Sequence, residues 1–132
     1  PYYVQSIDVE SRTARTITNA THAVAYDGTL YLCYSATDWT TYETVNTFFT
    51  YDVATATLSN QSFLKGDTVE IASNSVYMME VNPKNGELYI GLAGNKFVSS
   101  GVIHRFEKDG TPIHRFDVQG PNPNQAAFVN YQ

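Results

Sequence analysis

Short runs of apolar and aromatic residues alternate along this chain with groups of turn-forming residues. The turn groups are typical of tight links in β-hairpins: Asp27-Gly28, Ala54-Thr55-Ala56, Asn85-Gly86 and Asp109-Gly110. The pattern predicts strands near 2–9, 13–18, 22–26, 29–36, 45–53, 57–64, 76–81, 87–93, 101–107, 112–119 and 126–131. No segment has a helical period, so we expect an all-β chain.

Apolar residues in the segment 101–118, GVIHRFEKDGTPIHRFDV, do not keep to one face of a hairpin. In either register of that hairpin, both faces carry an aromatic or aliphatic side chain. A sheet with one solvated face would instead show a clean alternation of apolar and polar residues. We therefore expect sheets that are covered on both faces.

A sequence repeat underlies this pattern. At a constant offset of 58 residues, the repeat pairs Gly28 with Gly86, Tyr31 with Tyr89 and Leu32 with Ile90. At an offset of 55 it pairs Tyr51 with Phe106 and Leu58 with Ile113, and residues 6–14 form a partial third copy. The change of offset falls in a loop, where insertions are tolerated. The repeating unit is therefore two hairpins, whose four consecutive strands we call a, b, c and d.

Four-stranded antiparallel units that repeat about every 40–50 residues, with both faces covered, indicate the blades of a β-propeller. A β-sandwich is the alternative, although it does not explain the repeat. The chain holds about two and a half blades and closed propellers typically have 4–8, so we expect part of a larger ring. Assembly of several copies into one ring is the second interpretation. The expected parts of the single segment 1–132 are a c–d hairpin at 1–21, full blades at 22–75 and 76–120, and an innermost strand of the closing blade at 121–132.

Composition narrows the classes of function. Lys and Arg total 8 against 13 Asp and Glu, a net charge of −5, and no basic run exists to follow a phosphate backbone. We therefore expect no nucleic-acid binding. Cys33 is the only cysteine, which excludes an internal disulfide and a cysteine-based zinc site and predicts a small core residue. No stretch approaches the ~20 apolar residues of a membrane span, and the start at Pro1 predicts a processed or excerpted piece without a signal peptide.

Three stretches resemble the C-terminal region of YncE-like, surface-layer-type bacterial β-propellers: NATHAVAYDGTLYLCY, VYMMEVNPKNGELYIGLAG and GVIHRFEKDGTPIHRFDVQGPNPNQAAFVNY. The resemblance implies a surface lipoprotein of Bacteroidetes with a C-terminal domain of unknown function, at the cell surface, outer membrane or periplasm of a Gram-negative bacterium. Some relatives are seven-bladed and capture cobamides for an outer-membrane transporter. This implies a small-molecule ligand and a transporter or another surface protein as partners. Asp67-Thr68-Val69 resembles an O-glycosylation signal of that phylum, which makes Thr68 a candidate glycan site.

The sequence Ile-His-Arg-Phe occurs on both sides of Asp109-Gly110, within 103–116. A two-residue turn would place His104 opposite Arg115, whereas a three-residue loop would place His104 opposite His114. Only the second register brings the imidazoles together, and a zinc site would still need a third ligand. We interpret the duplication as structural, with cross-strand pairs and pairing to Asp117 or Glu107, and we expect no metal site.

The lengths of the connections predict where a ligand binds. The a–b and c–d links are tight turns, whereas the b–c loops at 36–45 and 94–101 and the d–a segments at 65–75 and 120–125 are longer and share the opposite end. Long loops on a rigid scaffold are where binding residues concentrate. The candidate ligand-binding residues combine aromatic rings with polar groups: Asp38, Trp39, Tyr42, Glu43, Asn95, Lys96 and Phe97. The alternative is that Trp39 and Phe97 fold back to cap their own blades.

Recognisable catalytic motifs are missing from the sequence: there is no Gly-x-Ser-x-Gly elbow, phosphate loop or metal-binding helix. We therefore expect no enzyme, no catalytic residue and no cofactor, and we interpret His22, which precedes an innermost strand, as structural. The first hypothesis is a non-catalytic binding or scaffolding propeller at the cell surface, with its ligand or protein partner on the long-loop face and capture of a cobamide-like nutrient as one version. Two alternatives stay open. One is a propeller hydrolase or lyase with its catalytic residues in other blades, and the other is a structural surface-layer or adhesion module.

Overall fold

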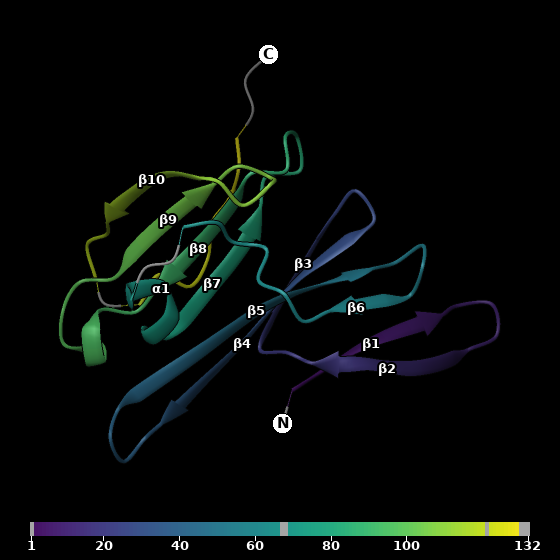
Figure 1. The fold of residues 1–132 in the computed structure, drawn as a ribbon, viewed down its shortest axis with the longest axis horizontal. Coiled ribbons are helices and arrows are strands. Elements are labelled where there is room, and N and C mark those ends of the chain that lie inside the picture. The colour runs from purple at the N-terminus through teal and green to yellow at the C-terminus, as the bar shows by residue number, and fades with distance from the viewer. Residues whose placement is uncertain (1, 67–68, 121, 130–132) are drawn as a thin grey trace.

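The computed structural model describes residues 2–66, 69–120 and 122–129, and within them the chain is built almost entirely from strands (Figure 1). The strands are β1 (Tyr3–Asp8), β2 (Thr13–Asn19), β3 (His22–Tyr26), β4 (Thr29–Asp38), β5 (Glu43–Asp52), β6 (Thr57–Ser59), β7 (Val76–Val81), β8 (Leu88–Leu92), β9 (Val102–Phe106) and β10 (Pro112–Asp117). One helical turn, α1 (Val69–Ser73), and one 3-10 turn, η1 (Asn95–Phe97), complete the described elements. The all-β prediction is confirmed.

The strands form three antiparallel sheets in the order of the chain. β1 and β2 make a two-stranded sheet, and the orders β3-β4-β5-β6 and β7-β8-β9-β10 make two four-stranded sheets. β3 lies beside β7, so the sheets are closest at the first strand of each four-stranded unit and spread apart from there (Figure 1).

The central sheet is covered on both of its faces, whereas β10, in the segment 101–118 from which covered faces were predicted, is exposed along its length. Because neighbouring residues of a strand point to opposite faces, Leu32 and Phe49 pack toward the β1–β2 sheet, in a cluster with Ile17. Cys33 and Phe48 point the other way and pack against the β7–β10 sheet. Leu32 and Cys33 are fully buried, which confirms Cys33 as a core residue; burial raises the pKa of its thiol to about 12.

Residues that the repeat pairs occupy equivalent places in the two four-stranded sheets. Leu32 packs toward the preceding sheet β1–β2, and its counterpart Ile90 packs toward its preceding sheet, β3–β6. Tyr31 faces the β7–β10 sheet, and its counterpart Tyr89 faces the segment 122–129, where its ring contacts Phe128 at 5.0 Å between centroids. The sequence repeat is therefore also a repeat of packing.

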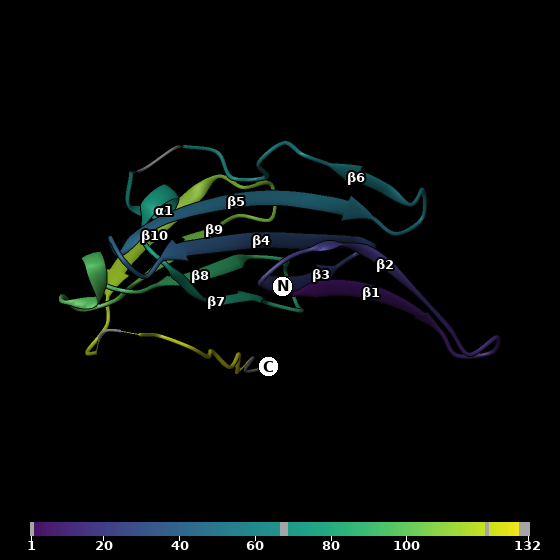
Figure 2. The same cartoon turned by 90° about the horizontal axis from the view of Figure 1, so that it is seen from below.

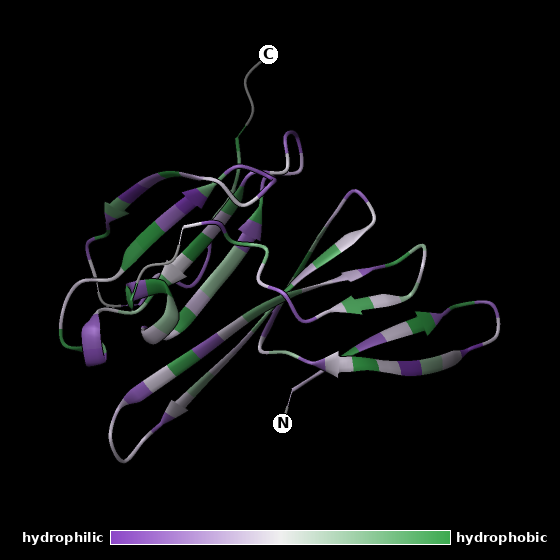
Figure 3. Cartoon of the chain, viewed as in Figure 1, coloured by the Kyte–Doolittle hydropathy of each residue, from purple (hydrophilic) through white to green (hydrophobic). Residues whose placement is uncertain are grey.

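The hairpin links follow the turn chemistry of the sequence. Asp27 and Gly28 both have left-handed backbones, with φ of 47° and 76°, as a two-residue type I′ turn requires. Hydrophilic residues gather at hairpin links such as 10–12 and 82–87, whereas apolar residues recur along the strands (Figure 3). The two-residue register of the β9–β10 hairpin also holds beyond a bulge, because His104 pairs with Arg115 and His114 with Arg105.

Three sequence predictions about the elements are wrong. The chain does contain a helical turn, α1, which at five residues is too short to show a period. β6 ends at Ser59 rather than near residue 64, because the segment that follows turns away toward the β9–β10 link. Residues 126–129 form no strand, and instead the described part of the tail crosses the outer face of β8, where Pro123 lies against Gly91 (Figure 2). Residues 130 and 131 of that predicted strand lie outside the described part.

No helix among the described residues is long and apolar enough to cross a membrane.

Candidate functional site

The connections that the sequence groups together do lie at one end of the molecule. In two perpendicular views, the β4–β5 link, α1 and the segment around η1 are close to each other (Figures 1 and 2). The tight links at 9–12, 27–28 and 53–56 lie at the other end of their sheets (Figure 1). This arrangement brings together side chains that are more than fifty residues apart in the sequence.

The first of these connections is a tight hairpin rather than the predicted loop 36–45. β4 and β5 continue until Asp38 pairs with Glu43, and the hydroxyls of Thr37 and Thr44 are hydrogen-bonded at 2.8 Å across the ladder. The Asp38 carboxylate accepts the backbone N–H of Thr40 at 2.8 Å, and this hydrogen bond lowers its pKa. Asp38 therefore shapes the link that carries Trp39, and its role in ligand binding stays a prediction.

The second connection is held by backbone contacts around Gly94. The Asn95 N–H donates to the Ser99 hydroxyl at 2.9 Å, and a side chain at Gly94 would collide with the Ser99 carbonyl, only 1.8 Å from its Cβ. The 3-10 turn has left-handed backbones at Lys96 and Phe97, with φ of 48° and 64°. The folded-back turn directs Phe97 toward the β4–β5 link.

Aromatic rings from the two connections form a cluster, which we call the aromatic end and define as Trp39, Tyr42, Tyr77 and Phe97. Trp39 stacks on Phe97 with 5.4 Å between ring centroids and 23° between planes. Tyr42 and Tyr77 meet Phe97 edge-on at 6.5 and 6.2 Å. The rings come from both four-stranded sheets, so the aromatic end spans the boundary between them.

These rings remain open to solvent although they contact each other. Trp39 is 63% exposed and Tyr42 is 51% exposed, whereas Phe97 and Tyr77 are partly buried. Large exposed aromatic groups gathered in one place are typical of interaction sites, because water contact with them is unfavourable. Tyr42 has a left-handed backbone, φ 58°, as Arg12 and Ala56 do in the other tight links, so this conformation belongs to the turn.

A cavity of about 410 Å³ adjoins the aromatic end, between the starts of β3 and β7. Trp39 and Tyr77 form part of its wall, and hydroxyl-bearing residues line much of the rest: Tyr2, Thr21, Ser35, Thr37 and Ser75. His22 lines it as well; burial lowers the pKa of its imidazole, and its Nδ1 is 3.1 Å from the Thr21 hydroxyl. Volumes of this size fall within the range of small-molecule sites, roughly 300–1,000 Å³.

The other predicted site residues lie around this end but do not face one another as a cluster. Glu43, Asn95 and Lys96 are exposed, and no hydrogen bond joins their side chains to one another. Sequence reasoning did not name Tyr77 or Ser75 as site residues, although Ser75 ends the predicted long segment 65–75, and it interpreted His22 as structural. They enter the site because β3 and β7 lie side by side at this end, and no local sequence pattern marks that contact. Thr68 lies outside the described residues.

The duplicated Ile-His-Arg-Phe segment is structural. His104 Nε2 lies 2.8 Å from a carboxylate oxygen of Glu70 on α1, and Arg115 donates two hydrogen bonds of 2.8 Å to the same carboxylate. Arg115 also pairs with Asp117 at 3.2 Å, as expected. The described residues contain no group of three or more His, Cys, Asp or Glu side chains that could hold a metal.

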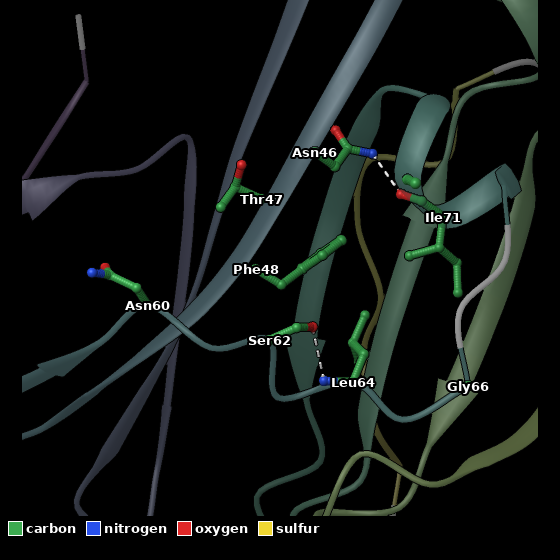
Figure 4. A pocket seen from close by; sticks show the side chains of 9 residues that line it. Asn46, Thr47, Phe48, Asn60, Ser62, Leu64, Gly66 and Ile71 are labelled. Carbon is green, nitrogen blue, oxygen red and sulfur yellow. Dashed lines mark hydrogen bonds between the residues drawn. The ribbon is translucent and has the colours of Figure 1, made fainter.

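A second cavity, also of about 410 Å³, lies between β5, the segment 60–66 and α1 (Figure 4). Its apolar side is formed by Phe48, Leu64 and Ile71. Asn46 in its wall donates to the backbone carbonyls of Ile71 and Asn74 at 2.8 and 2.6 Å, so this amide ties α1 to β5. The cavity lies away from the exposed rings of the aromatic end.

No family model matches this chain, and no curated protein matches it either.

Proposed function

We propose that this chain is a non-catalytic binding module made of β-propeller blades, which holds a small ligand or a protein partner at the aromatic end. The observation that carries the proposal is the stack of Trp39 on Phe97, which joins two connections 58 residues apart in sequence and leaves Trp39 63% exposed. Burial of exposed rings by a ligand would supply favourable free energy, and the adjoining cavity offers polar groups for orientation.

Blade architecture is supported by the order of the strands and by the equivalent packing of repeated positions. Each four-stranded sheet is a consecutive antiparallel meander, and adjacent sheets pack face to face through two separate apolar clusters. Such units stack radially in propellers. The placement in a larger ring and at the cell surface rests on the resemblance to YncE-like, surface-layer-type propellers.

Two features of the site favour binding over catalysis. The Asp38 carboxylate is engaged by backbone N–H groups of its own turn, and the His22 ring is hydrogen-bonded to Thr21. The His22 imidazole is also hydrogen-bonded to the backbone of Tyr77, and the described lining of the cavity includes no carboxylate that could act with it as an acid–base pair. The aromatic end therefore has a binding surface without an evident acid–base pair.

The test is an NMR screen of the isotope-labelled chain against sugars, nucleosides, amino acids and a cobamide. The chain has one tryptophan, so the single indole N–H signal of Trp39 reports on the aromatic end. We expect binders to shift that signal, and Trp39→Ala and Phe97→Ala each to abolish their binding while the protein stays folded. Val45→Ala, at an exposed apolar residue of the same hairpin, is the matched control and should leave affinity unchanged.

Unchanged affinity in both aromatic variants would overturn the proposed site. So would binders that shift signals of Asn60 and Leu64 in the cavity of Figure 4 and leave Trp39 unaffected.

A further inference from the structure

The cavity beside Trp39 has chemistry that narrows the class of ligand, on the premise that the proposed binding function is correct. Its described lining includes no Asp, Glu, Lys or Arg side chain. The imidazole in it, His22, has its pKa lowered by burial, which disfavours its charged form. A charged ligand would lose hydration there without gaining a counter-charge, which is unfavourable.

The cavity nevertheless offers hydrogen-bonding groups that are not used within the fold. The Trp39 indole N–H and the hydroxyls of Ser75 and Tyr77 make no hydrogen bond to another described residue, although all three residues line the cavity. Solvent reaches the hydroxyls of Ser75 and Tyr77, because no buried side-chain polar atom of the less exposed described residues lacks a partner, and Trp39 is itself 63% exposed. A purely apolar ligand would displace water from these groups and leave them unpaired, at a cost in affinity.

Other hydroxyls in the wall, those of Ser35 and Thr21, are already positioned by the fold. The Ser35 hydroxyl donates to Asn46 at 2.6 Å and accepts the Val76 N–H at 3.1 Å, and the Thr21 hydroxyl bonds the Cys33 carbonyl at 3.1 Å. These bonds fix the wall on β3, β4 and β7 before any ligand arrives. A wall that is ordered in advance reduces the entropy lost on binding.

The exposed rings add a platform next to these donors. The face of an aromatic ring carries partial negative charge, so it attracts C–H groups that carry partial positive charge, such as those on a ring of carbons bonded to oxygen. Trp39 is held by its stack on Phe97, at 5.4 Å, and therefore presents a pre-oriented surface. A neutral ring with C–H groups on its faces and hydroxyls on its edge matches both the platform and the donors.

We propose that the cavity beside Trp39 binds a neutral saccharide, with its C–H face on the aromatic end and its hydroxyls on Ser75, Tyr77 and the Trp39 indole N–H. The volume of about 410 Å³ admits a mono- or disaccharide unit. The activity that follows from such a site is the binding of a neutral glycan by this protein.

The test uses the fluorescence of Trp39, the only tryptophan of the chain. Maltose and cellobiose are titrated as neutral disaccharides, and methyl β-glucoside is compared with methyl β-glucuronide as a matched neutral and charged pair. We expect a saturable change in emission with neutral sugars and at least a tenfold weaker response to the glucuronide. Ser75→Ala removes one hydrogen bond and should weaken binding about 3- to 10-fold. Ser6→Ala, at an exposed serine of β1, is the control and should change affinity less than twofold.

Other results would contradict either the neutral-saccharide site or the proposed binding function. Equal or tighter binding of the glucuronide, or unchanged affinity in Ser75→Ala, overturns the neutral-saccharide site. If no sugar changes the Trp39 signal but a cobamide or another compound does, and Phe97→Ala abolishes that change, the saccharide inference fails and the proposed binding function stands. If no compound of the screen affects Trp39, both fail.

Discussion

The β9–β10 hairpin and the aromatic end hold the two most unusual groups of side chains, and they differ in how those groups are satisfied. In the hairpin, His104 and Arg115 share the Glu70 carboxylate, and Arg105 donates to Glu87 at 2.8 and 2.9 Å. At the aromatic end, large rings are exposed, and polar groups of the cavity wall such as the Ser75 and Tyr77 hydroxyls have no partner among the described residues.

This contrast indicates which cluster to associate with function. The paired charges of the first group connect α1 to the β9–β10 hairpin, so their role in stabilising the fold explains their presence. The exposure of large aromatic rings is unfavourable for the isolated chain, because water contact with them costs free energy, so the stability of the fold does not explain it. The more conspicuous sequence, Ile-His-Arg-Phe written twice, belongs to the first kind.

The largest effect on stability is expected at the link of the structural hairpin. Gly110 has φ 87°, and a Cβ on it would lie 1.8 Å from the carbonyl oxygen of Phe63. We expect Gly110→Ala to lower the free energy of unfolding by about 2–4 kcal/mol, since both the left-handed backbone and the collision oppose it. Urea unfolding followed by circular dichroism measures this value.

Gly28→Ala is the matched control for that substitution. Gly28 has a similar φ of 76°, but no atom lies within 4 Å of the position that a Cβ would take there, so only the backbone term remains, about 1 kcal/mol. Equal losses in the two variants would show that the approach of Phe63 to the hairpin link is unimportant. Neither substitution should change binding at Trp39.

The next largest effect is expected for Glu70→Gln, which removes the charge shared by His104 and Arg115. The hydrogen bonds to charged groups that are lost are worth about 1–2 kcal/mol after allowance for the partial exposure of Arg115. Asp117→Asn is the control, because Asp117 is an exposed partner of the same arginine and should matter by less than about 0.5 kcal/mol. A smaller loss for Glu70→Gln than for Asp117→Asn would contradict the structural role of the cluster.

The unsubstituted protein and Glu70→Gln should also differ in how their stability depends on pH. Hydrogen bonds from Arg115, and also from His104, lower the pKa of Glu70 from 4.5 to about 2. Between these values the unfolded chain binds a proton at Glu70 that the folded chain does not, so the contribution to stability is complete above about pH 4.5 and is lost as pH falls toward 2. The difference in unfolding free energy between the two proteins should therefore be smaller at pH 3 than at pH 7, and an unchanged difference would contradict the ion pairing.

Local chemistry explains which parts of this architecture can be predicted from sequence. The turn at Asp27-Gly28 and the alternation of Leu32 with Cys33 are set by neighbouring residues, and so are the strands and covered faces derived from them. The meeting of Trp39 with Phe97 also follows from chain order, because both connections fall at the same end of their sheets. To predict these features, it is enough to know the two-residue period of the strands and the end of the sheet at which each connection lies.

The missed features depend on contacts between distant residues. Glu70 meets residues 34 and 45 positions further along the chain, and no local pattern marks it as their partner. The β4–β5 hairpin extends further than predicted because the hydroxyls of Thr37 and Thr44 are hydrogen-bonded across it. Both residues are polar, so an apolar pattern could not indicate this part of the strands. Tyr77 and Ser75 enter the cavity only because β7 lies beside β3.

The smallest effect on stability is expected where the effect on binding is greatest. Trp39 is 63% exposed, so Trp39→Ala removes little buried surface and should lower the free energy of unfolding by about 1 kcal/mol or less, chiefly through the lost stack on Phe97. Urea unfolding by circular dichroism, with Val45→Ala as the exposed apolar control, gives the comparison. A loss as large as that of Gly110→Ala would mean that Trp39 caps the sheets and belongs with the structural hairpin. A small loss of stability together with abolished ligand binding would mean that the Trp39 ring serves binding and not the stability of the fold.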